Sequence, residues 1–178
     1  ASATLAPAAL QEVRQKLQIN SLKSFFINLG NDRPNIAPRV VQMKNSSDYT
    51  ALLDLVAKGI MGPEDLSKMI IFTNSIQKTL EIQRFLRQNL PISCYPYIDV
   101  FHALRSARSK KRSLERFQNS QTKILVATEA AGMGADIPDI KAVIQFGVPA
   151  SLEVWTQRAG RAGRTPDLQA CATLLVEQ

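Results

Sequence analysis

The chain has 178 residues, of which 45% are hydrophobic and 21% charged, with eight glycines and nine prolines. This composition fits one globular domain and excludes collagen-like, coiled-coil and wholly disordered chains. The excess of 22 Lys and Arg over 15 Asp and Glu gives a formal net charge of +7, which favours anionic partners. Purely apolar runs such as residues 69–72 are far shorter than the roughly 20 residues that cross a bilayer. We therefore expect no membrane-spanning segment and no membrane partner.

Cysteine and histidine are too sparse for a metal site of the usual kind. Cys94 and Cys171 lie far apart, and His102 is the only histidine. The sequence therefore predicts neither a zinc site nor a disulfide framework, and its cysteines are typical of an intracellular protein.

The first thirty residues differ in pattern from the rest. A helix is expected to start near Pro7, with Leu10, Val13 and Leu17 on one face, and residues 30–34 (Gly-Asn-Asp-Arg-Pro) are typical of a linker. Because the chain begins at Ala1 without an initiator Met, we interpret it as a piece of a longer protein. Residues 1–30 are expected to be the tail of a preceding domain, and residues 31–178 a second domain.

From residue 39 onward, short β-rich runs alternate with helical patterns. The helices are expected over residues 49–60, 76–90 and 109–118, and the strands over residues 39–43, 68–73, 98–101, 123–128, 141–146 and 172–176. Such alternation is the signature of βαβ units. The sequence therefore predicts an α/β fold with a mainly parallel sheet flanked by helices.

The segment from Gln157 to Arg164, Gln-Arg-Ala-Gly-Arg-Ala-Gly-Arg, carries the strongest chemical signal. Its arginines, Arg158, Arg161 and Arg164, recur every third residue, so on a helix they would share one broad face. Glycines inside a helix cost about 1 kcal/mol each, which suggests a close approach to a ligand or another domain. Clustered guanidinium groups suit phosphate. The alternative is a solvated basic helix face.

A glycine-rich turn follows the predicted strand at residues 123–128. Gly132 and Gly134 allow close backbone approach, and Asp136 offers a carboxylate to a ribose hydroxyl. Ligands in open α/β sheets bind beyond the carboxyl ends of strands, where this turn would lie. Ile137 stands where a dinucleotide-binding fingerprint requires a third glycine, so that fingerprint is rejected. The alternative is a tight turn whose glycines serve only the backbone.

Together, the two segments resemble motifs V and VI of superfamily-two helicases, in which two RecA-like lobes clamp ATP and a nucleic-acid strand. Residues 2–4 (Ser-Ala-Thr) resemble motif III at the end of the first lobe, and residues 69–73 resemble motif IV. The resemblance implies that residues 31–178 form a second RecA-like lobe with a three-layer fold, and that residues 1–30 are the tail of the first lobe plus a linker.

Within the superfamily, residues 132–139 and 148–153 resemble the RecQ-type DNA helicases most closely. Three positions depart from that group. Arg158 replaces an acidic residue and is nearer the RNA-helicase pattern, Leu104 replaces a glycine, and Lys110 replaces an arginine. A DEAD-box RNA helicase lobe and a lobe that binds nucleic acid without turnover therefore remain alternatives.

The resemblance also implies residue roles. Arg164 would be an arginine finger with Arg161 as its partner, and the ATP-binding set would be Gly134, Asp136, Gln157 and Arg158. The nucleic-acid set would be Thr128, Gly132, Thr73, Asn74 and His102. The expected partners are single-stranded or forked nucleic acid, with DNA favoured over RNA, and the first helicase lobe. The protein would be nuclear in a eukaryote.

The chain lacks the phosphate-binding loop, since it contains no Gly-Lys dipeptide. ATP and Mg²⁺ would therefore be bound mainly by the first lobe, and no metal ligand is assigned here. We expect this segment to be inactive alone and to act as part of an ATP-dependent helicase.

One basic run has two interpretations. Six of the twelve residues from Arg105 to Arg116 are basic and one is acidic. The run could extend a groove that follows phosphates, or it could be a solvated helix face.

Overall fold

A computed structural model of the chain describes residues 7–20, 23–25, 33–128, 137–165 and 167–177. The chain divides into two compact units, Ala1–Pro34 and Asn35–Gln178. Helix α1 (Pro7–Lys16) belongs to the first unit, where Lys16 Nζ lies 2.7 Å from Glu12 Oε1. The second unit contains the sheet and all the residues discussed below.

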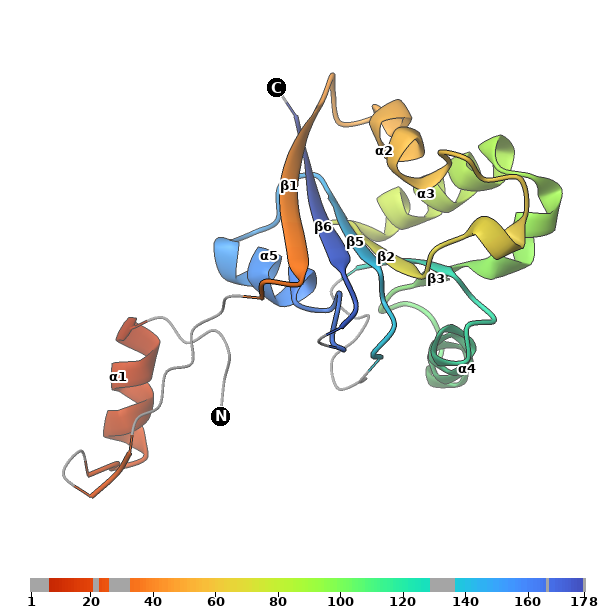
Figure 1. The fold of residues 1–178 in the computed structure, drawn as a ribbon. Coiled ribbons are helices and arrows are strands. Elements are labelled where there is room, and N and C mark those ends of the chain that lie inside the picture. The colour runs from red at the N-terminus through yellow and green to blue at the C-terminus, as the bar shows by residue number, and fades with distance from the viewer. Residues whose placement is uncertain (1–6, 21–22, 26–32, 129–136, 166, 178) are drawn as a thin grey trace. The chain divides into compact units, whose positions relative to one another are not determined.

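The second unit is built on a six-stranded sheet in which every strand pair is parallel. Its order is β1-β6-β5-β2-β4-β3 (Figure 1). The strands are β1 (Ile36–Met43), β2 (Met69–Phe72), β3 (Ile98–Phe101), β4 (Ile124–Ala127), β5 (Ala142–Phe146) and β6 (Ala170–Glu177). The predicted α/β fold with its mainly parallel sheet is confirmed, and all six predicted strands are present.

The central strands are apolar throughout because helices cover both faces of the sheet. All four residues of β2 (Met-Ile-Ile-Phe) and of β4 (Ile-Leu-Val-Ala) are buried. Continuous hydrophobic runs are typical of parallel strands, which are shielded on both sides. β1 lies at one edge of the sheet, and most of its side chains are exposed.

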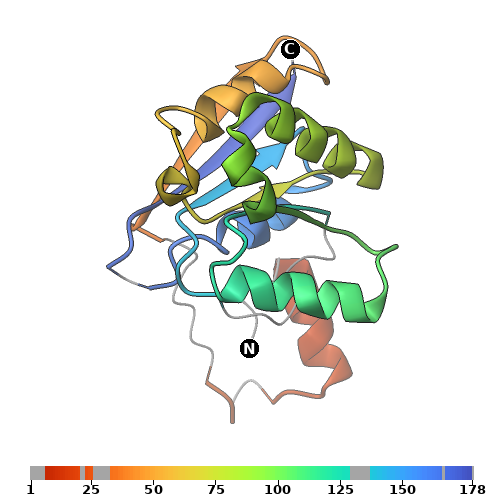
Figure 2. The same cartoon turned by 90° about the vertical axis from the view of Figure 1, so that its right-hand side faces the viewer.

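Helices α2 (Tyr49–Val56) and α3 (Ile76–Asn89) cover one face, where Leu52 and Ile82 pack with Ile71. Helices α4 (Ala107–Gln118) and α5 (Leu152–Ala159) cover the other, where Phe117 packs with Phe72. Figure 2 shows α3 above and α4 below the edge of the sheet. Two short 3₁₀ helices, Pro63–Asp65 and Ile92–Tyr97, complete the described elements.

Three helices that follow strands begin at serine caps. Ser75, Ser106 and Ser151 accept hydrogen bonds from the third backbone N–H of α3, α4 and α5. A serine oxygen there satisfies one of the unpaired N–H groups of the first turn. The helix predicted over residues 49–60 ends earlier, at Val56, because Gly59 takes a positive φ of 77°. No helix in the described ranges is long and apolar enough to span a membrane.

Candidate functional site

The carboxyl ends of the neighbouring strands β2, β4 and β3 meet around one hollow. Thr73 and Asn74 follow β2, Ala103 lies two residues beyond β3, and Thr128 follows β4. The hollow has a volume of about 600 Å³, and its other lining residues are Ser75, Ile76, Val148, Ala150 and Arg158. The structure thus brings together Thr73, Asn74 and Thr128, which the sequence assigned to nucleic acid, and adds Arg158, which it assigned to ATP.

Arg158 is 6% exposed and lines this hollow. Its Nη1 donates to Gln145 Oε1 and, at 3.5 Å, to Asn74 Oδ1. Its guanidinium carbon lies 5.1 Å from the centre of the Phe72 ring, a cation–π distance. Arg158 therefore connects α5 to the ends of β2 and β5.

Two further contacts complete this network. Gln145 Nε2 donates to the Gly147 carbonyl at 2.9 Å, and Asn74 Nδ2 donates to the Val148 carbonyl at 2.7 Å. Asn74 is exposed and presents its amide at the hollow. Thr73, by contrast, is fully buried, and its hydroxyl donates to the Ser75 carbonyl at 2.9 Å. The Thr73 side chain thus shapes the turn after β2, whereas Asn74 is placed to contact a ligand.

His102 is half-buried at the end of β3. Within the described part of the chain, its Nδ1 is buried without a hydrogen-bond partner. Burial lowers the pKa of His102, and the charges of Arg105 and Lys110 act in the same direction. An uncharged imidazole at neutral pH offers a hydrogen bond rather than a positive charge.

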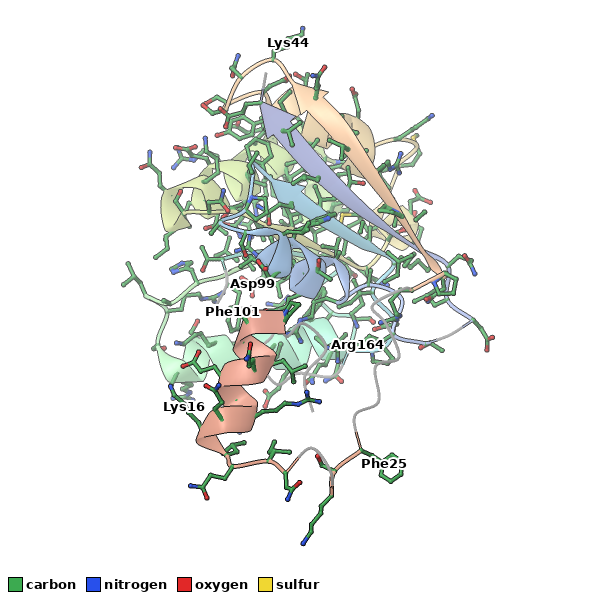
Figure 3. The ribbon with its side chains drawn as sticks, turned by 90° about the vertical axis from the view of Figure 1, so that its left-hand side faces the viewer. Lys16, Phe25, Lys44, Asp99, Phe101 and Arg164 are labelled. Atoms are coloured by element: carbon green, nitrogen blue, oxygen red, sulfur yellow. The ribbon has the colours of Figure 1, made fainter. Side chains whose placement is uncertain are left out.

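The expectation that the three arginines share a helix is wrong. α5 ends at Ala159, Gly160 caps it, and Gly163 has a φ of 54°. The helix has already ended before Gly163, and this left-handed residue prevents a right-handed helix from continuing through Arg164. Arg158 lies within α5, while Arg161 and Arg164 lie in the turn that follows; Figure 3 marks Arg164 below α5.

Asn35 holds this arginine turn in place. Its Nδ2 lies 2.7 Å from the Gly163 carbonyl and 3.0 Å from the Leu168 carbonyl. The Gly163 N–H donates to the Ile140 carbonyl at 2.9 Å, and Thr165 Oγ1 donates to the Pro138 carbonyl at 3.3 Å. The turn is therefore fastened to the start of β1 and to the segment that precedes β5.

Arg161 and Arg164 lie close enough to influence each other. Burial, and secondarily the charge of Arg164, holds the pKa of Arg161 below its ordinary value. An anion beside the pair would stabilise both charges, so the pair suits a phosphate group. Gln157 is exposed on α5. Gly132, Gly134 and Asp136 lie outside the described residues, whereas Ile137, which follows them, packs with Ala162 of the arginine turn.

Two residues of this region, Gln145 and Asn35, were not predicted from the sequence. Gln145 carried a signal, because it is a polar residue in an otherwise apolar strand that is buried on both faces. Asn35 carried none, since its partners lie about 130 positions further along the chain. Among the described residues, no three His, Cys, Asp or Glu side chains gather where they could hold a metal ion.

Comparisons with known proteins match this architecture. The model of the helicase conserved C-terminal domain matches residues 49–166. Human ATP-dependent DNA helicase Q4 is 32% identical over 147 residues, which cover 78% of this chain and 12% of that protein. ATP-dependent DNA helicase RecQ of Haemophilus influenzae is 31% identical over 176 residues, covering 99% of this chain and 26% of that protein.

RNA helicases match as well. ATP-dependent RNA helicase DBP3 of Saccharomyces cerevisiae is 28% identical over 177 residues, covering 97% of this chain and 32% of that protein. The structure of S. cerevisiae Dbp5 bound to RNA and ADP BeF3 superimposes with a TM-score of 0.79 at 19% identity, covering 99% of this chain and 44% of that one. This structural likeness shows the fold.

The chain spans about a third or less of the length of these curated relatives. The matched model covers well over half of the chain, including the hollow and the arginine turn. The chain therefore belongs to the helicase conserved C-terminal domain family and is the C-terminal lobe of a superfamily-two helicase.

Proposed function

We propose that this chain is the second motor lobe of an ATP-dependent, RecQ-like DNA helicase that unwinds DNA in the 3′ to 5′ direction. One observation carries the proposal: the turn that holds Arg161 and Arg164 is hydrogen-bonded to Pro138 and Ile140, directly after the glycine-rich segment. The arginine turn thus contacts the residues that follow the glycine-rich segment, although the two lie about 25 residues apart in the sequence. Residues 1–30 are, in this proposal, the tail of the first lobe.

ATP and Mg²⁺ supply a reactive phosphoanhydride and the counter-charge for its oxygens, and both would be bound mainly by the first lobe. Arg164 and Arg161 would approach the phosphates from this lobe and stabilise the charge that develops there. Gly134, Asp136 and Gln157 would line the nucleotide, with Asp136 accepting hydrogen bonds from the ribose. Because the phosphate-binding loop would lie on the other lobe, this chain alone is not expected to hydrolyse ATP.

The hollow at the strand ends would hold the nucleic-acid strand. Asn74, Thr128 and the backbone near Gly132 would contact phosphate oxygens, and His102 would donate or accept one hydrogen bond. Arg158 touches both Gln145 and Asn74 at this hollow, so it would position Asn74 rather than bind ATP. A movement of α5 together with the arginine turn would then shift Asn74.

DNA is proposed over RNA because residues 132–139 and 148–153 resemble the RecQ-type DNA helicases. The identities to the DNA helicases Q4 and RecQ (32% and 31%) and to the RNA helicase DBP3 (28%) are too similar to separate the two substrates. The RNA helicase DBP3 supports the second candidate, a DEAD-box-like lobe. Either helicase would act inside the cell, in the nucleus of a eukaryote.

The test measures ATP hydrolysis by the whole protein with oligo(dT), oligo(U) or neither. Arg164→Ala should lower strand-stimulated turnover by about 10³-fold, the lower end of what an arginine finger supplies. Arg84→Ala is the matched control, because Arg84 is exposed on α3, on the opposite face of the sheet.

Each outcome has a distinct meaning. Turnover that depends on DNA and is lost with Arg164→Ala supports the proposal. Stimulation by oligo(U) alone moves the protein to the RNA helicases. Turnover that is unaffected by Arg164→Ala contradicts the arginine assignment, and no turnover under any condition makes this a binding lobe.

A further inference from the structure

The positive charge of the chain is concentrated on one helix. Residues 105–116 hold six basic residues and one acidic residue, a formal charge of +5, whereas the whole chain carries +7. Most of this stretch is α4, which has no acidic residue in its first turn.

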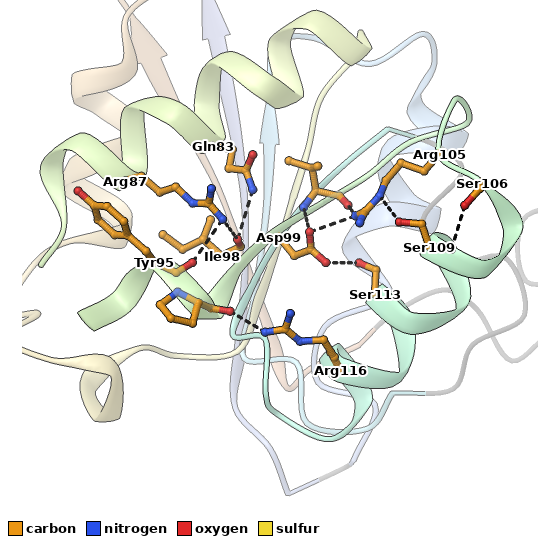
Figure 4. A network of polar contacts seen from close by, with 12 residues as sticks. Gln83, Arg87, Tyr95, Ile98, Asp99, Arg105, Ser106, Ser109, Ser113 and Arg116 are labelled. Atoms are coloured by element: carbon orange, nitrogen blue, oxygen red, sulfur yellow. Dashed lines mark hydrogen bonds and ion pairs between the residues drawn. The ribbon is translucent and has the colours of Figure 1, made fainter. Parts of the chain in front are cut away.

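One side of α4 is fastened to the neighbouring strand (Figure 4). Asp99 of β3 accepts a hydrogen bond from Ser113 Oγ at 2.6 Å and pairs with Arg105 Nη1 at 3.0 Å. Arg105 also donates to Ser109 Oγ at 2.9 Å and to the Val100 carbonyl. Arg105 is thus engaged in holding the start of α4.

The far end of α4 is fastened in the same way. Arg116 Nη2 donates to the Pro96 carbonyl at 2.9 Å, and Phe117 is fully buried against the sheet. These contacts fix which side of the helix faces outward.

The outward side carries Arg108, Lys111 and Arg112, which we call the α4 stripe. All three are exposed, and with Glu115 they line a shallow hollow of about 460 Å³. Residues three and four positions apart are neighbours on a helix surface, so the three cations form one cluster. The acidic residue nearest in sequence, Glu115, lies 4.0 Å from Lys111, and that pair is exposed.

This arrangement does not favour the stability of the helix. Arg108 and Arg112 are like charges spaced four residues apart, which repel. Arg108 also lies in the first helical turn, where the helix dipole disfavours a cation. Solubility alone would be served by mixed charges. An anion bound along the stripe would offset both unfavourable effects.

The stripe begins close to the hollow at the strand ends. Ala103 lines that hollow, and Arg108 follows five residues later, so the two lie at most about 18 Å apart along the chain. From Arg108, α4 runs about 15 Å further to its end at Gln118. A strand that leaves the hollow on this side would meet the α4 stripe.

We propose that the α4 stripe is an accessory phosphate-binding site for the single strand that continues beyond the hollow. The partner is the phosphodiester backbone, read by charge and without regard to sequence. This inference rests on the proposed nucleic-acid function of the lobe. The stripe lengthens the binding site and takes no part in ATP hydrolysis.

The test uses the whole protein and two lengths of oligo(dT) and oligo(U). The short strand is the shortest one that stimulates ATP hydrolysis fully, and the long strand extends well beyond it. The variant is Arg108→Ala/Lys111→Ala/Arg112→Ala, in which alanine preserves the helix. For the long strand, the slope of log affinity against log salt should become shallower by about 2, since each lost phosphate contact contributes about 0.7.

A control variant removes the same charge elsewhere. Lys44→Ala/Lys58→Ala/Arg84→Ala takes three exposed cations from the side of the sheet that carries α2 and α3. This control should keep the wild-type slope. The stripe variant should also keep wild-type affinity for the short strand and full ATP turnover when strand is saturating.

Equal slopes for the stripe variant and the wild-type protein on the long strand would overturn the inference, and so would the same loss in the control variant. If the α4 stripe bound an acidic protein and not nucleic acid, the stripe variant and the wild-type protein would show equal slopes on the long strand. If the wild-type protein bound neither strand, the proposed function itself would fail, which is a different result.

Discussion

At the scale of single residues, Arg158 has the most demanding environment. It is 6% exposed and holds Gln145 and Asn74 together while lying over the Phe72 ring. The sequence grouped it with Arg161 and Arg164 because of its spacing, yet its side chain serves the neighbouring hollow. A buried guanidinium needs polar partners because an unpaired buried charge is costly.

Arg158→Ala should therefore destabilise the protein by about 2–3 kcal/mol, since hydrogen bonds to a charged group are lost and Gln145 loses a donor. The measurement is urea unfolding with an unchanged m-value. Arg84→Ala, an exposed control, should stay within about 0.5 kcal/mol of the wild-type protein. Equal stability of the two variants would show that Arg158 contributes no structural support.

At the scale of elements, the decisive feature is the turn after α5. Gly163 has a φ of 54°, and a Cβ there would lie 2.8 Å from Asn35 Nδ2 and 3.0 Å from Ala170 Cβ. Glycine is needed at position 163 because the backbone there is left-handed and because a side chain would not fit between Asn35 and Ala170. The turn, rather than a continuous helix, determines where Arg161 and Arg164 lie.

Gly163→Ala should lower the free energy of unfolding by about 2–4 kcal/mol, because the left-handed backbone and the crowding both disfavour alanine. Gly59→Ala is the matched control: its φ is 77°, but a Cβ there would meet nothing within 4 Å. That variant should cost only about 1–2 kcal/mol, the backbone part alone. Urea unfolding of both variants makes the comparison, and an equal cost would mean that crowding by Asn35 and Ala170 is relieved without strain.

At the scale of the whole molecule, the order of strands determines which parts open first. β2, β4 and β5 are central, whereas β1 lies at an edge with exposed side chains. β3 lies at the other edge but is largely buried beneath α3 and α4. Local opening depends on buried contacts as well as on position.

Amide hydrogen exchange should therefore be slowest in β2, β4 and β5. Amides of β1 should exchange at least about tenfold faster, which corresponds to an opening free energy lower by about 1.4 kcal/mol. β3 is the internal control, because an edge strand that is covered should be better protected than β1. If β1 and β3 exchanged alike, edge position rather than burial would govern the opening.

Much of this fold could be predicted from local pattern. The six strands and the helices between them follow from hydrophobic period, and the parallel sheet follows from their alternation. The roles of Asn74, His102 and Thr128 were expected from the resemblance to helicases, and all three follow the carboxyl ends of strands, where ligands bind in such sheets. The prediction of one helical arginine face was wrong, because the three-residue spacing of the arginines does not distinguish a helix from a turn that contains a positive-φ glycine.

The sequence by itself determined the kind and order of the elements and the chemistry at their ends, because both depend on residues close together in the chain. Only the tertiary structure decided which distant residues meet: Asn35 with the arginine turn, Gln145 with Arg158, and Asp99 with α4. The physical reason is that a buried polar group must find its partner in space, and packing of the sheet and helices brings that partner from anywhere in the chain.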